Sequence, residues 1–182
     1  MADEIIVKNK LECIYDKISY ICNGELTYSK YERAGYRGKN SNQVLNVKNL
    51  STGLKTFVIL KTLLKNGSIE QNSTVILDEP EIHLHPEWQL LFAELIVLLQ
   101  KEFGVHVLLN THSPYFLRAI QIYSAKYGIA DSCRYYLSEE VEGQAEITDV
   151  TGEIDKIYAK LSHPLQRLED ERWQMKQIQI RS

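Results

Sequence analysis

Two short, mainly apolar runs lie along this chain, with stretches of helical spacing before, between and after them. The runs, 74–77 and 105–109, are short and end in polar residues, so they predict buried strands. Helical spacing marks 51–66, 86–103 and a stretch beginning at Pro114. Strands that alternate with helices in this order are typical of a parallel sheet with helices on its faces.

The two ends of the chain give weaker patterns. In residues 1–48, a short strand is predicted at Ile5–Val7, and helical spacing follows at Leu11–Ile18. The alternation of apolar and polar residues from Tyr20 to Leu26 suggests another strand. Periodicity therefore does not decide the structure of this segment. Near the other end, Arg134–Leu137 and Glu146–Thr148 predict a strand pair around Gly143. A final helix is expected over 154–176, interrupted at His163-Pro164.

Two acidic residues, Asp78 and Glu79, directly follow the first apolar run and precede Pro80. A carboxylate at a buried edge is costly unless a positive charge neutralises it. Open α/β sheets place ligand chemistry at this end of their strands, and a magnesium–nucleotide complex would supply the charge. The alternative for these residues taken alone is a solvated acidic turn.

Two other polar segments change this interpretation. Leu50-Ser-Thr-Gly53 resembles the signature loop of ATP-binding-cassette ATPases, and Ile76–Pro80 resembles their Walker B strand with its catalytic glutamate. Glu81–Pro86 takes the place of the D-loop, and Asn110–Ser113 resembles the switch-histidine segment. The sequence of these motifs is similar to that of the soluble AAA/ABC-like ATPases of bacterial genome maintenance and antiviral defence, such as the OLD-like and PtuA-like groups. The resemblance covers about residues 43 to 170.

The resemblance implies an α/β fold of the P-loop NTPase type: a parallel-sheet half-domain over 49–176 with helices on both faces, a small β pair and a C-terminal helix. It also implies ATP and Mg²⁺ as cofactors. Asp78 would hold the magnesium through water, and Glu79 would orient the attacking water. His112 would contact the γ-phosphate, while Ser51, Thr52 and Gly53 would complete the site of another subunit.

The Walker A pattern G-x-x-x-x-G-K-[ST], which cradles phosphates, does not occur in this sequence. The nearest stretch, Gly35–Asn40, has its glycines too close together and predicts a solvated basic turn. The chain therefore resembles the C-terminal half of such an ATPase, whether as a fragment or as one product of a split gene. The expected partner is a second copy or a Walker A-bearing subunit, and the chain alone is expected to be inactive.

Composition narrows the possible partners. The 182 residues carry 21 basic and 24 acidic side chains, a net charge of −3, so bulk charge gives no reason to expect nucleic acid. The tyrosines and basic residues of 28–42 are compatible with nucleic-acid contact but also with a solvated loop or hairpin edge. In defence or repair systems, nucleic acid would be reached through an effector. The three cysteines are odd in number and fit no C-x-x-C pattern, which indicates reduced thiols. Together with the acidic N-terminus and the lack of a membrane-length apolar run, this predicts a cytoplasmic protein without a membrane partner.

Two alternatives to an ATPase remain at this level. One is a non-catalytic interaction module derived from such an ATPase. The other is a metal-dependent nuclease that uses Asp78, Glu79 and Glu81, with Glu139–Gly143 as a faint second acidic motif. His83 and His85 have the spacing of a zinc-chelating pair, but the sequence supplies no third ligand nearby.

Overall fold

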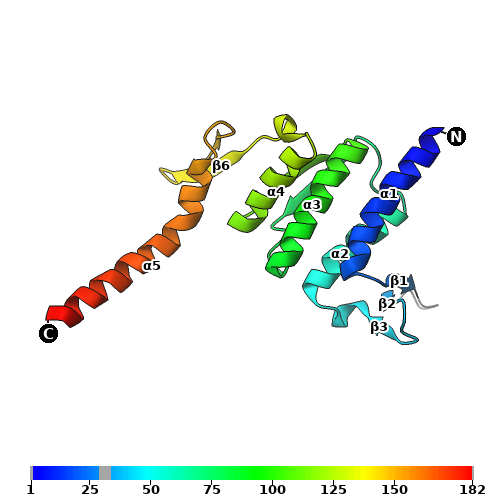
Figure 1. The fold of residues 1–182 in the computed structure, drawn as a ribbon, viewed down its shortest axis with the longest axis horizontal. Helices are drawn as coiled ribbons and strands as arrows, with labels where there is room; N and C mark the ends of the chain where they lie inside the picture. Colours follow the sequence, from blue (N-terminus) through cyan, green and yellow to red (C-terminus); the bar gives the residue numbers. More distant parts are fainter. Residues whose placement is uncertain (1, 29–33, 182) are drawn as a thin grey trace.

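The computed structural model describes the backbone of residues 2–28 and 34–181, and the side chains of 12–27 and 34–178. Its elements in chain order are α1(Ala2–Ile21), β1(Glu25–Tyr28), β2(Ala34–Arg37), β3(Val44–Asn46), η1(Val47–Asn49), α2(Thr52–Lys65), β4(Thr74–Asp78), α3(Pro86–Phe103), β5(His106–Asn110), α4(Pro114–Lys126), η2(Ala130–Ser132), β6(Tyr136–Val141), β7(Gln144–Asp149) and α5(Asp155–Arg181). The α1–α4 helices run beside one another and α5 extends away from them (Figure 1). The expected α/β class is confirmed.

The parallel pair β4–β5 is the structural centre of the predicted site. Its register places Thr74 opposite His106 and Asp78 opposite Asn110, so both strands end at the same edge. Alternate residues Val75, Leu77, Val107 and Leu109 pack against the helical core. The other face is open, with Ile76 72% and Leu108 62% exposed. This differs from the predicted burial by helices on both faces, because among the described residues the helices that pack on the sheet lie on one side of it.

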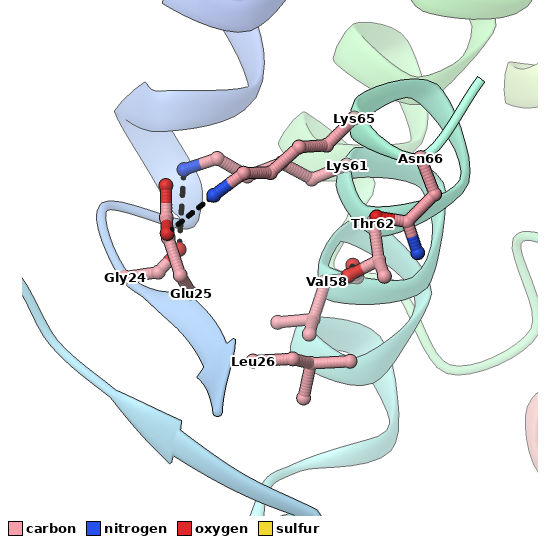
Figure 2. A pocket seen from close by; sticks show the side chains of 8 residues that line it. All are labelled: Gly24, Glu25, Leu26, Val58, Lys61, Thr62, Lys65 and Asn66. Atoms are coloured by element: carbon pink, nitrogen blue, oxygen red, sulfur yellow. Dashed lines mark hydrogen bonds and ion pairs between the residues drawn. The ribbon is translucent and has the colours of Figure 1, made fainter. Parts of the chain in front are cut away.

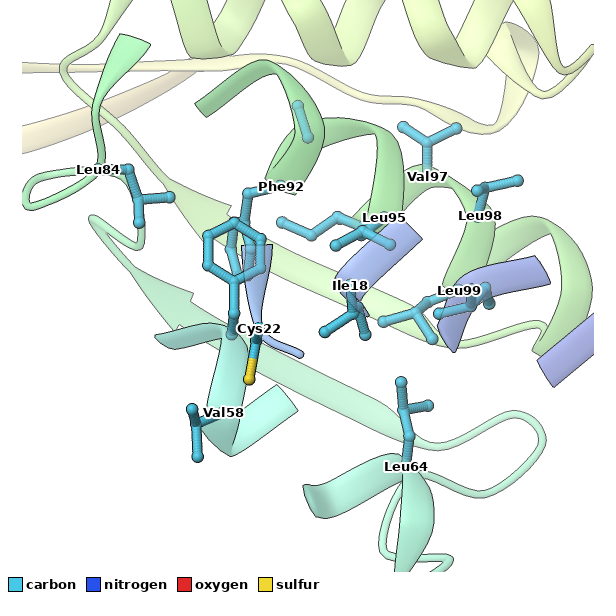
Figure 3. Close-up of a cluster of buried hydrophobic side chains, with 14 of the residues drawn as sticks. Ile18, Cys22, Val58, Leu64, Leu84, Phe92, Leu95, Val97, Leu98 and Leu99 are labelled. Carbon is cyan, nitrogen blue, oxygen red and sulfur yellow. The ribbon is translucent and has the colours of Figure 1, made fainter. Parts of the chain in front are cut away.

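Helix α3 forms the middle of the core. Its residues from Phe92 to Leu99 are all buried, and α1, α2 and α4 pack around it (Figure 3). Phe57 of α2 packs edge-on against Phe92 with ring centroids 5.5 Å apart. The predicted bounds of α3 are confirmed: Pro86 starts the helix without losing a needed hydrogen bond, and Gly104 ends it in the left-handed conformation at φ 65.

The N-terminal segment folds as a helix followed by an antiparallel sheet of order β1-β2-β3. The predicted strand at Ile5–Val7 is wrong, because these residues lie inside α1. Ile14 and Ile18 are almost completely buried in the common core, which is the helical alternative that the spacing of 11–18 allowed. Tertiary packing of this apolar stripe therefore decides the structure that local pattern left open.

The stretch Gly35–Asn40 is also corrected. Only its second part forms a turn, because Ala34–Arg37 is the strand β2. Tyr36 is buried, and its hydroxyl oxygen accepts a hydrogen bond of 2.9 Å from the Gly24 amide. Tyr36 is therefore not available for stacking on a nucleic-acid base. The basic residues at 30 and 33 lie outside the described residues.

The predicted strand pair near the C-terminus is confirmed as the hairpin β6–β7, which turns at Glu142 and Gly143, both with positive φ. The expected interruption of the last helix is wrong: α5 is continuous, with Pro164 inside it. Proline leaves the carbonyl of Lys160 without its helical partner, but this part of α5 is exposed, so water can satisfy that oxygen. No helix in the described part of the chain is long and apolar enough to cross a membrane.

A buried carboxylate, Glu94, ties three helices together. It accepts hydrogen bonds from Lys17 of α1 at 2.9 Å and Lys126 of α4 at 3.0 Å, and another from the Tyr127 hydroxyl. Burial alone would raise the pKa of Glu94, but the bonds from Tyr127, Lys17 and Lys126 outweigh it and hold the pKa at about 2. The charged form is thus the form that the fold stabilises.

We expect Glu94→Gln to lower the free energy of unfolding by about 3 kcal/mol at neutral pH, since each unit of pKa shift is worth about 1.4 kcal/mol. Because the folded-state pKa lies below its ordinary value of 4.5, this stability is present above pH 4.5 and disappears as the pH falls toward 2. Urea unfolding followed by circular dichroism between pH 7 and pH 3 measures it. Glu87→Gln, an exposed acid on the same helix, is the control; a wild-type and variant difference that does not shrink on acidification contradicts the prediction.

Candidate functional site

The predicted acidic tip of β4 meets the polar end of β5. Asn110 connects them: its side-chain nitrogen donates to Asp78 Oδ1 at 2.6 Å, and its oxygen accepts from the Glu79 amide at 2.8 Å. One amide side chain therefore fixes both the carboxylate of Asp78 and the backbone of Glu79. The sequence analysis gave Asn110 no role, although its register opposite Asp78 in a parallel pair was a usable signal.

Glu79 and His112, the two predicted catalytic residues, lie side by side. Glu79 Oε1 is 3.1 Å from His112 Nε2, and the side chains are 33% and 82% exposed. Glu79 has a φ of 42, a left-handed conformation that is unfavourable for a residue with a side chain. Such backbone strain persists where the surroundings impose it, and it occurs often at functional sites. The structure thus brings together an accessible carboxylate and an accessible imidazole.

Asp78 lies at the exposed end of β4, next to this pair. Mg²⁺ prefers oxygen ligands and keeps several of its waters, so a solvent-accessible carboxylate held by Asn110 suits a hydrated magnesium ion. The chemistry of the donor set therefore fits the predicted cofactor.

The predicted signature residues form the start of α2. Ser51 is the N-cap, and its hydroxyl oxygen accepts from the Leu54 amide at 3.3 Å. Ser51 and Thr52 are exposed, so the free amides of this helix start are open to an anion. Gly53 differs, since it is buried, and a Cβ there would lie 2.8 Å from the backbone oxygen of His83. Its lack of a side chain allows the turn after β4 to pack against α2.

That turn, residues 81–86, carries a feature that the sequence analysis missed. Glu81 is only 3% exposed and accepts a hydrogen bond from the Thr111 hydroxyl, beside His112. His83 and His85 are exposed, and the side chains that the structure describes contain no group of three potential metal ligands. No signal in the sequence indicated that the Glu81 carboxylate is buried, because its partner Thr111 follows another strand.

The acids of the nuclease alternative are held apart by different partners. Asp78 is bonded to Asn110, Glu79 lies against His112, and Glu81 is buried against Thr111. Glu139–Gly143 lies in the exposed β6–β7 hairpin. This arrangement gives the nuclease interpretation no support.

A small hollow lies between β1 and the C-terminal half of α2 (Figure 2). The amine of Lys61 donates to the backbone oxygens of Cys22 and Gly24, each at 3.1 Å, and Lys65 pairs with Glu25 at 2.7 Å. Both lysines are therefore already occupied by groups of the protein. The hollow is lined by the opposite end of α2 from Ser51, so it is not part of the acidic site.

Comparison with known proteins shows the family of this chain. Residues 15–118 match the family described as "AAA domain, putative AbiEii toxin, Type IV TA system". The chain is 31% identical over 93 residues to the "Retron Vc95 probable ATPase" of Vibrio cholerae serotype O1 biovar El Tor, covering 45% of this chain and 17% of that protein. It thus spans less than a fifth of the length of this relative.

Two solved structures share the fold. One comes from work on "ATP-driven dimerization and DNA stimulated activation of SMC ATPases", with a TM-score of 0.51, 16% identity and coverage of 93% of this chain and 92% of that one. The other, an SmcHead bound to the C-winged helix domain of ScpA, has a TM-score of 0.55, 18% identity and coverage of 84% and 44%. The family match covers more than half of the sequence. The chain therefore belongs to this AAA-domain family and has the fold of the P-loop, ABC-type ATPases.

Proposed function

We propose that this chain is the signature, Walker B and switch part of an ABC-type ATPase that binds and hydrolyses ATP with Mg²⁺. It acts when a Walker A-bearing half completes its nucleotide site, and two such units pair as a sandwich dimer around the nucleotides. The observation that carries the proposal is the accessible Glu79–His112 pair beside Asp78, at the shared end of two parallel strands. Open α/β sheets bind their ligands at this position.

Each side chain has a defined task in this proposal. Asp78 holds the hydrated magnesium ion, which neutralises charge on the phosphates. Glu79, oriented through the bond from its own amide to Asn110, accepts a hydrogen bond from the attacking water. His112 lies close enough to Glu79 to bond both that carboxylate and a phosphate oxygen. The exposed amides at Ser51 and Thr52 contact a phosphate held by the other subunit.

The open face of the β4–β5 sheet supports the need for a completing half. Parallel sheets are usually covered on both faces, yet Ile76 and Leu108 expose most of their side chains here. Within the described residues this sheet has just the two strands, so each has an unpaired edge. A Walker A half that adds strands to an edge and a helix to the open face would bury this surface.

The relatives suggest a biological setting. The family description reads "putative AbiEii toxin, Type IV TA system", and the Vibrio cholerae relative is described as "Retron Vc95 probable ATPase". We infer that the chain serves a bacterial antiviral-defence system, or one of DNA repair, in which ATP state is passed to an effector that meets nucleic acid. A cytoplasmic location follows from this role.

The proposal is tested by measuring ATP turnover with and without a Walker A half, supplied in cis or as a separate chain. We expect negligible hydrolysis by the 182-residue chain alone and Mg²⁺-dependent hydrolysis on complementation, because phosphates need a cradle that this sequence lacks. Asp78→Asn in the completed protein is the matched control and should abolish the gain. Turnover by the chain alone, or a complemented protein that binds its partner but never hydrolyses ATP, contradicts the proposal; the second result favours a non-catalytic interaction module.

A further inference from the structure

The buried carboxylate of Glu81 needs an explanation, because an acid side chain that is 3% exposed is costly without partners. One oxygen accepts from the Thr111 hydroxyl. The other, Oε2, is buried without a hydrogen-bond partner among the described residues. Thr111 therefore makes the contact that keeps this carboxylate in place.

Thr111 uses the same hydroxyl twice. It donates to Glu81 and accepts from the Ser113 amide at 3.0 Å. His112 lies between these two residues, so the backbone on both sides of the imidazole is fixed by one hydroxyl group. His112 itself is mostly exposed and has little packing of its own to hold it near Glu79.

The hydrogen bonds continue into a closed circuit. The Ser113 hydroxyl donates to Gln89 Oε1 at 2.8 Å and accepts from the Phe116 amide at 3.2 Å. Gln89 in turn donates to the Leu84 carbonyl at 3.2 Å, and the Leu84 amide donates to the Glu81 carbonyl at 2.8 Å. The turn after β4, the start of α3 and the start of α4 are thus linked through Glu81 and Thr111.

The same turn also touches α2. The backbone oxygen of His83 packs so closely on Gly53 that no side chain fits between them. A shift of the α2 start therefore presses on the turn, and Glu81 is the member of the turn that holds the residue preceding His112. These contacts connect the exposed helix start at Ser51 with the Glu79–His112 pair.

We propose that Glu81 is a positioning residue: its buried carboxylate clamps Thr111 and so holds His112 against Glu79, coupling the start of α2 to the hydrolytic pair. The clamp is a property of this chain alone. Its consequence for hydrolysis rests on the proposed ATPase function. The two parts are separated by measuring the His112–Glu79 contact in the isolated chain and turnover in the completed protein.

The test compares Thr111→Val, which removes the hydroxyl at similar volume, with Thr111→Ser, which restores it. In the isolated chain, nuclear Overhauser contacts between the His112 ring and the Glu79 side chain should be lost in the valine variant and kept in the serine variant. Exchange of the Ser113 amide with solvent should speed up on the order of tenfold in the valine variant. Contacts and exchange unchanged in Thr111→Val overturn the clamp, whether or not the completed protein hydrolyses ATP.

Glu81→Leu is a second variant, and it separates a positioning role of Glu81 from a purely structural one. Because Glu81 Oε2 is buried without a partner among the described residues, replacing this carboxylate with an apolar side chain of similar size should change the melting temperature little, yet the His112–Glu79 contact should be lost. In the completed ATPase, kcat should fall on the order of tenfold in Thr111→Val and Glu81→Leu with KM changed less than about twofold, and recover in Thr111→Ser. Normal kcat in variants that have lost the contact overturns the coupling to hydrolysis.

Discussion

Glu79→Gln should slow ATP hydrolysis by the completed protein on the order of 100-fold or more, while ATP still drives it into a dimer. Glutamine keeps the size of the side chain but cannot take a proton from the attacking water, and general-base catalysis of this kind contributes about 10²–10⁴-fold. The contacts with nucleotide that we propose for Asp78 and for the α2 start do not involve this side chain, so nucleotide-driven pairing should persist. Turnover assays and light scattering with and without ATP measure the two effects separately.

Two controls sharpen this experiment. Glu87→Gln changes an exposed acid on the next helix and should leave both turnover and dimer formation as in the wild type. Glu79→Gly removes the carboxylate and also the strain of a positive φ, which glycine tolerates. It should therefore be as inactive as the glutamine variant even though its backbone is less strained. A Glu79→Gln protein that keeps wild-type turnover, or that no longer dimerises with ATP, is incompatible with the role assigned to this carboxylate.

Mixing two inactive subunits should restore activity if the start of α2 serves the nucleotide of the partner. The first subunit carries Ser51→Asp and the second carries Glu79→Gln, each in a protein that has a Walker A half. Aspartate remains a good N-cap for the Leu54 amide, so α2 should stay folded, but its charge repels a phosphate. Gly53 is avoided as the target, because any side chain there collides with His83 and would disturb the fold.

The expected result follows from where the lesions meet. If Ser51 acts across the interface, the heterodimer combines both lesions in one composite site and leaves the other site intact, so turnover should rise to a substantial fraction of wild type over either homodimer. If Ser51 acts within its own subunit, each site carries one lesion and mixing gives no gain. Ser51→Thr, which keeps an uncharged cap, should be active before mixing. No gain of turnover on mixing contradicts the trans arrangement if a heterodimer with a single lesion is active. If that heterodimer is also inactive, hydrolysis at the two sites is coupled.

The parts of this protein that follow from local pattern were predictable. The Pro86 start and Gly104 end of α3 follow from backbone chemistry that acts within a few residues. The meeting of the Asp78 and Asn110 ends follows from two parallel strands that finish in polar residues. The proximity of Glu79 and His112 then required only that they lie one and two residues beyond the ends of these strands. The predicted roles of Ser51, Asp78, Glu79 and His112 remain predictions.

What could not be predicted depends on partners far away in sequence. Glu94 lies on a helix whose pattern marks it as an ordinary charged position, and its burial is made possible by Lys17, which is 77 positions away. Glu81 likewise becomes buried because of Thr111, 30 positions further along the chain. The helical structure of Ile5–Val7 and the burial of Tyr36 depend in the same way on the core against which their elements pack.

The bare face of the β4–β5 sheet has a consequence for the life of this polypeptide in a cell. Unpaired strand edges beside exposed Ile76 and Leu108 are features that promote aggregation and attract chaperones and proteases. In the assembly that we propose, the completing half would cover this face, so association would also protect the protein from these fates.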